Sequence, residues 1–238
     1  MSRPIRMPLG RTLLLCLLGF GLVGCGSSTQ TQPPGVPPTP KSVSVAEPGG
    51  DAHDAHWAAL TRQLSQPWGE RNDKDDQILL PLPDWEHWKR VRYWGVSHFV
   101  GFRYGDDHHV VAIGFVLDVP KGSPTDADTC MRHFESWARP QMRGYEVKLT
   151  PIRGHETAWR GKPIIVKSVD GYVDTAFSRK KFSAAWAAIP AYPDACFIYA
   201  MAVPWRDHEE LARKVRDRWV QEAFDKVKPL TELHPERK

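Results

Sequence analysis

The segment from Val110 to Val119 constrains the fold most, because it carries apolar side chains on both faces of an extended chain. Successive side chains of a strand point to opposite faces of the sheet. The odd-numbered positions from Val111 to Val119 are all large and apolar, and the even-numbered positions include Ala112, Gly114 and Val116. We therefore expect a central strand with other elements packed on both sides of it.

Strand signals also precede this segment. The run Tyr93 to Tyr104 is aromatic and β-branched, and Gly105-Asp106-Asp107 supplies turn residues before Val110, which predicts a hairpin. Ile78 to Leu82 predicts another strand, and Pro81 places it at an edge or an end because proline cannot donate a ladder hydrogen bond. Between these strands, Asp84 to Arg90 predicts one helical turn with Trp85 and Trp88 on a shared face.

The second half of the chain predicts four more strands, the last of them strongly apolar and interior. They cover residues 145–149, 164–173, 177–186 and 195–203. The odd-numbered residues of the first alternate with polar ones, as in a half-buried strand.

Three helices are predicted from apolar side chains at helical spacing. The first covers 51–64 and stops before Pro67. The second follows the capping residues Asp126 and Asp128 and runs to about Met142, with Cys130 on its apolar side. The third is amphipathic, covers 207–228 and ends at Pro229.

This order of elements predicts the α+β class, a bent antiparallel sheet covered by helices that include a long C-terminal one. In element order, from about Ile78 to Val227, it resembles the PsbP-like arrangement. That resemblance implies a domain that binds or assembles, and it assigns no functional residue.

The amino terminus has the pattern of an export signal. Arg3, Arg6 and Arg11 precede the apolar stretch Thr12 to Val23, as in a secretory signal peptide. The stretch is shorter than the roughly 20 apolar residues of a transmembrane helix. The residues Leu22 to Cys25, LVGC, resemble the lipobox of bacterial lipoproteins.

The lipobox resemblance implies that residues 1–24 are removed and that Cys25 carries a diacylglyceryl thioether and usually a third acyl chain, such as palmitate. Two or more chains anchor stably, since each buried methylene contributes about 0.8 kcal/mol. Gly26 stands where inner-membrane lipoproteins of proteobacteria often carry Asp. The resemblance therefore implies the outer membrane of a cell envelope, with the domain facing the periplasm or the surface.

Residues 25–50 are rich in Pro, Gly and Ser and predict a disordered, semi-stiff linker of several tens of Å. We expect one globular domain over 51–238. The formal net charge is +4, and loss of the three signal arginines leaves about +1. A net charge this small does not indicate nucleic-acid binding, which usually requires a basic patch or stripe.

Two cysteines remain after Cys16 is removed and Cys25 is acylated, namely Cys130 and Cys196. Exported proteins meet an oxidising compartment, so we predict a disulfide between them. The alternative is that Cys130 is a nucleophile activated by His133, one helical turn away. The core-facing position of Cys130 argues against that alternative.

Two histidine pairs are weak metal candidates. His53 and His56 lie one turn apart in the first helix, and His108 and His109 lie at the hairpin tip. Zinc sites need three or four protein ligands, and no HExxH or paired CxxC motif supplies the others. We expect solvated surface at both pairs, with no metal and no cofactor.

The leading hypothesis for function is a noncatalytic envelope lipoprotein that binds a protein or glycan partner. The sequence contains no G-x-S-x-G elbow, phosphate-binding loop or dinucleotide fingerprint. Four aromatic residues are candidates for a binding surface: Trp85, Trp88, Tyr93 and Trp94. If they are exposed, their rings can stack against a glycan or a peptide. The alternative is that they belong to the core.

Two other hypotheses remain open. One is an envelope hydrolase acting on peptidoglycan, peptide or ester bonds through scattered carboxylates or through His98 and His155. The other is a lipoprotein toxin or its immunity partner.

Overall fold

The computed structural model describes residues 50–71, 78–91, 99–120, 122–123, 125–141, 146–174 and 179–229. The predicted signal peptide, Cys25 and the linker before residue 50 lie outside these residues. Tyr93, Trp94 and His98 also lie outside them.

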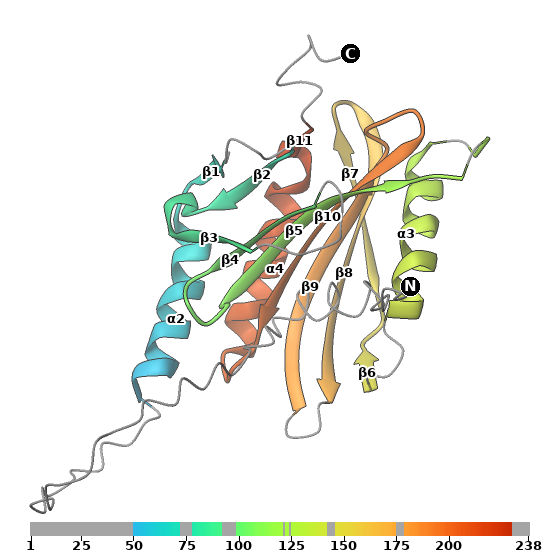
Figure 1. Ribbon diagram of the computed structural model, residues 1–238. Coiled ribbons are helices and arrows are strands. Elements are labelled where there is room, and N and C mark those ends of the chain that lie inside the picture. Colours follow the sequence, from blue (N-terminus) through green and yellow to red (C-terminus); the bar gives the residue numbers. More distant parts are fainter. Residues whose placement is uncertain are drawn as a thin grey trace, which may run out of the picture.

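The described strands form one antiparallel sheet of eight strands and one of three. The large sheet has the order β3 (Trp88–Val91), β4 (Phe99–Tyr104), β5 (Val110–Asp118), β10 (Ala195–Pro204), β9 (Arg179–Ile189) and β8 (Lys162–Asp174). Beyond them, β6 (Glu146–Leu149) and β7 (Arg153–Trp159) both pair with β8 (Figure 1). The small sheet has the order β1 (Trp68–Arg71), β2 (Ile78–Pro83) and β11 (Lys228–Pro229).

Helices cover both faces of the large sheet (Figure 1). On one face Phe197, Tyr199 and Met201 of β10 share a core with Trp219 of α4 (Glu209–Glu222), against which α2 (Gly50–Ser65) packs. On the other face, Cys196, Ile198 and Ala200 of the same strand pack beneath α3 (Ala127–Gln141). Alternation along one strand therefore supplies two cores, and the predicted α+β class is confirmed.

The expectation for β5 is also confirmed. This strand lies between β4 and β10, and all residues from Val110 to Phe115 are buried. An extended segment with apolar groups on both faces is stable only where both faces are covered.

The prediction for Pro81 is wrong for the strand as a whole, because β2 is the middle strand of the small sheet. However, β11 pairs only with Ile78 and Leu79. Pro81 itself is paired with only one strand, through Glu70 of β1, because β11 does not reach it. The missing N–H is therefore tolerated at a position where the ladder is one-sided.

The predicted helical turn over 84–90 is only partly formed. Residues Trp85–His87 form a single 3-10 turn, and Trp88 begins strand β3. Trp85 and Trp88 therefore do not share a helix face. Pairing of Trp88–Val91 with β4 outweighs the local helical spacing.

The C-terminal helix ends at Glu222, earlier than expected, and a 3-10 turn follows over Phe224–Lys226. Phe224 and Val227 are nevertheless buried, as their spacing predicts. The Val227 carbonyl accepts a hydrogen bond of 3.0 Å from the indole N–H of Trp159 on β7. Pairing of Lys228–Pro229 with β2 takes the chain out of the helix.

Candidate binding site

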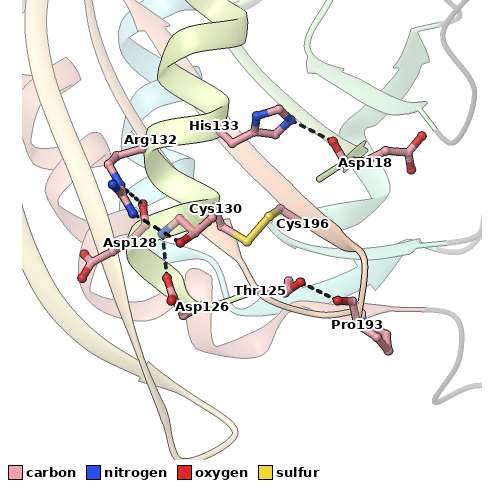
Figure 2. Close-up of a disulfide and its surroundings, with 10 residues drawn as sticks. Asp118, Thr125, Asp126, Asp128, Cys130, Arg132, His133, Pro193 and Cys196 are labelled. Carbon is pink, nitrogen blue, oxygen red and sulfur yellow. Dashed lines mark hydrogen bonds between the residues drawn. A yellow bond between two sulfur atoms is a disulfide. The ribbon is translucent and has the colours of Figure 1, made fainter. Parts of the chain in front are cut away.

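The first turn of α3 is fixed to the sheet by a covalent bond. Cys130 forms a disulfide with Cys196 of β10, with their Cα atoms 5.6 Å apart (Figure 2). Asp126 caps the helix by accepting a hydrogen bond of 2.7 Å from the Thr129 N–H. The predicted disulfide is therefore present in the structure.

His133 does not activate Cys130. Its Nε2 makes a hydrogen bond of 2.8 Å to the Asp118 carbonyl oxygen (Figure 2). Since the sulfur of Cys130 is already bonded to another sulfur, it is not a thiolate nucleophile in this structure. The nucleophile alternative is wrong for this oxidised state.

Beneath the last turns of α3 lies an apolar pocket of about 310 Å³. Its walls come from α3, β6, β8, β9 and β10. It lies between two groups of buried side chains, one that includes Phe134 and one that includes Val169 and Phe182. Trp186 packs against both groups and also lines the pocket.

The hollow exists because small side chains occupy the positions that would fill it. Ala138 of α3, Ala184 of β9 and Ala200 of β10 all line the pocket. Close-packed interiors leave few voids larger than a water molecule. Three alanines in facing elements therefore leave a space that larger side chains would have filled.

The mouth of the pocket exposes apolar groups. Leu149 is 41% exposed and Ile152 is 46% exposed, and both line the pocket. Exposed large apolar side chains grouped beside a pocket are typical of binding surfaces. The mouth is therefore a place where another molecule can bury apolar area.

Among the described residues, three charged side chains also line this pocket. Lys167 of β8 forms an ion pair with Glu135 of α3. Arg139 lies one turn further along the helix, is exposed, and makes no ion pair with any residue in the described part of the chain. The apolar pocket thus carries one more positive than negative side chain.

The predicted aromatic surface is not assembled as expected. Trp88 is fully buried, at 0% exposure, and its indole N–H donates a hydrogen bond of 2.7 Å to the Pro83 carbonyl. Its ring contacts Tyr104 and Trp219. Trp85 remains 44% exposed. The core alternative is therefore correct for Trp88.

The fold brings one histidine of each predicted pair together and buries both, so the expectation of solvated surface is wrong for His56, which is 0% exposed, and for His109, which is 6% exposed. Nδ1 of His56 lies 2.9 Å from Nδ1 of His109, and Nε2 of His56 donates to the Pro204 carbonyl at 3.0 Å. The ring centroid of His53 lies 4.0 Å from that of His208, a residue outside the two predicted pairs. Within the described residues, no group of three or more His, Cys, Asp or Glu side chains is arranged to hold a metal ion.

The His56–His109 contact requires a neutral His56 ring. Because Nε2 of His56 carries the hydrogen that binds the carbonyl, its Nδ1 is free to accept the N–H of His109. Burial and the charge of His109 lower the pKa of His56 to about 3. Burial and Arg206 lower the pKa of His109 to about 4, against the opposing effect of Asp107.

We expect the protein to lose stability as the pH falls below about 6.5. Both folded-state pKa values lie below the ordinary histidine value of 6.5, so the unfolded chain binds more protons and gains stability on acidification. Each ring should cost about 2 kcal/mol at pH 5, since one pKa unit corresponds to about 1.4 kcal/mol. Urea unfolding at pH 7.5 and pH 5 measures this loss.

The double variant His56→Gln, His109→Gln is the control for this pH dependence. It removes both titrating rings, so its unfolding free energy should change much less between the two pH values. An equally steep acid loss in the double variant would place the sensitivity at other groups.

The hydrolase hypothesis draws on His155, whose Nε2 lies 2.9 Å from the Ser168 hydroxyl oxygen. Ser168 is buried, whereas a serine nucleophile must reach its substrate. Neither residue lines the apolar pocket. This contact therefore links β7 to β8 and does not present a nucleophile at that site.

No protein-family model matches the chain, and no curated protein sequence matches it. Solved structures that are similar to it include three described below. The cyanobacterial PsbP of Synechocystis is 12% identical over 68% of this chain and 92% of its own, with a TM-score of 0.44. The Ran-binding protein Mog1p of Saccharomyces cerevisiae is 13% identical over 70% of this chain and 97% of its own, with a TM-score of 0.48.

The third is LpqN of Mycobacterium tuberculosis, described as involved in cell envelope biogenesis. It is 13% identical over 63% of this chain and 88% of its own, with a TM-score of 0.34. The α+β class of this chain rests on its own strand order and helices. In the described part of the chain, no helix has the length and apolar content needed to cross a bilayer.

Proposed function

We propose that the protein is a noncatalytic, membrane-anchored lipoprotein of the bacterial cell envelope whose folded domain binds an apolar group of a partner. The anchor is Cys25, on the evidence of the LVGC segment and the basic and apolar residues before it. The linker over residues 26–50 gives the domain reach from the bilayer.

The pocket beneath α3 is the observation that carries the binding proposal. Ligand sites are concave and mostly apolar, with a few polar groups that fix orientation. The pocket meets this description through its alanine-lined hollow, its exposed apolar mouth and the charged Lys167, Glu135 and Arg139. An apolar lining favours an apolar group over the polar face of a glycan.

A photocrosslinking amino acid at Ile152 tests this proposal in intact cells that produce the full chain. We expect adducts at Ile152, because this side chain is exposed at the pocket mouth. Trp57 of α2 is exposed to a similar extent, does not line the pocket and serves as the control position. Ala138→Leu should reduce the adducts at Ile152 by at least about tenfold, since a loss of 1.4 kcal/mol in binding is tenfold.

Ser136→Leu is the matched control for Ala138→Leu, because it adds the same side chain on the exposed face of the same helix. Equal adduct yields in the two leucine variants would contradict binding in the pocket. The intact mass of the purified chain tests the anchor. A product that keeps Met1, or that carries no fatty acid at Cys25, would contradict the anchored location.

A further inference from the structure

The apolar pocket is large enough to accept a flexible hydrocarbon chain. An apolar cavity of about 150 Å³ already binds a molecule such as benzene, and this pocket measures about 310 Å³. It is still near the lower limit for ligand sites, which range from about 300 to 1,000 Å³. A pocket of this small volume suits a single alkyl chain better than a polycyclic or two-chain ligand.

The mouth of the pocket combines exposed apolar side chains with positive charge, the two features that an anionic amphiphile needs at the entrance to its site. Leu149 and Ile152 present apolar side chains at the entrance, where the outer part of an alkyl chain would otherwise meet water. Beside them, the described lining provides two cationic groups, Lys167 and Arg139, and one carboxylate, that of Glu135. An anionic head group is attracted by this excess of positive charge.

From this combination we infer that the pocket binds a single-chain anionic amphiphile of the fatty-acid type. Its alkyl chain lies beneath α3 beside Ala138 and Ala184, and its carboxylate lies at the mouth near Arg139 and Lys167. The inference rests on the proposed function, since the lipid anchor holds the domain at a bilayer, where such amphiphiles are concentrated.

The test uses the full chain in phosphatidylcholine vesicles doped with a photoactivatable dodecanoic acid, or with the matching dodecanol. After irradiation, mass spectrometry of the peptides locates the label. We expect the acid to label peptides of α3, β6 and β9 in the wild-type protein. Ala138→Leu should lower this labelling by at least about tenfold, while Ser136→Leu should leave it unchanged.

The charge of Arg139 is tested by comparing the two probes. Arg139→Gln should lower labelling by the acid about two- to fivefold, the value of an exposed ion pair, and should not lower labelling by the alcohol. Arg132→Gln removes another exposed arginine of α3 that does not line the pocket, so it should change neither. An equal decrease for both probes in Arg139→Gln would overturn recognition of the anionic head.

Labelling that is equally strong in Ala138→Leu and Ser136→Leu, or that falls outside the pocket, would overturn the inference. Its failure can be distinguished from failure of the proposed function. If protein adducts form at Ile152 in cells while the acid leaves the pocket unlabelled, the pocket binds a partner that is not a fatty acid. If neither reaction labels the pocket, both proposals fail.

Discussion

Reduction of the Cys130–Cys196 disulfide should lower the free energy of unfolding by about 4 kcal/mol. The bond closes a loop across a sequence separation of 66 residues, and cross-links of that span restrict the unfolded chain by about this amount in the chain-entropy model. Both cysteines are buried, so reduction also leaves two thiols inside a packed core. Urea unfolding with and without a reductant measures the difference.

The control is the double variant Cys130→Ala, Cys196→Ala. It should be less stable than the oxidised protein and should unfold at the same urea concentration with or without reductant. A wild-type midpoint that does not move on reduction would show that the cross-link adds nothing to stability.

Replacement of Trp88 by alanine should cost about 3–5 kcal/mol, the usual range for a buried aromatic side chain. The side chain is fully buried between Tyr104 and Trp219. Its removal also leaves the Pro83 carbonyl without its indole donor. Thermal unfolding of Trp88→Ala should show a large fall in the melting temperature.

Trp85→Ala is the matched comparison, three residues earlier in the chain. Trp85 is half exposed, so we expect a loss below about 1 kcal/mol. Similar losses for the two variants would contradict the placement of Trp88 in the core and of Trp85 at the surface.

Patterning along single segments predicted much of the sheet and its helices. The two apolar faces of Val110–Phe115 required a central strand, and β5 is central. The apolar side of 127–141 placed Cys130 toward the sheet, where Cys196 lies. These features depend on the period of the side chains, which is a local property of the sequence.

Features that depend on distant pairing were not predicted. Strand β7 has polar residues at most positions and is held by its ladder with β8. The short strand β11 takes the end of a helical pattern because its partner in β2 lies far away in the sequence. Local spacing carries no information on either partner.

The candidate site was missed for a similar reason. Its pocket is defined by small side chains from separate elements, and a single Ala138, Ala184 or Ala200 has no distinctive sequence signal. The sequence also does not predict the contact between His56 and His109, although both residues are metal candidates. No local pattern joins them, because His56 lies within helix α2 and His109 directly precedes strand β5, 53 residues later in the chain.

The disulfide lies at one end of α3 and the pocket at the other. Cys130 is in the first turns of the helix, whereas Ala138 and Arg139 belong to its last turns. Helix α3, which covers the pocket, is thus bonded covalently to the sheet near its amino-terminal end and is held by non-covalent contacts at its carboxyl-terminal end. A guest that needs more room should therefore displace the carboxyl-terminal turns of α3 before the first turn, which the disulfide holds against β10.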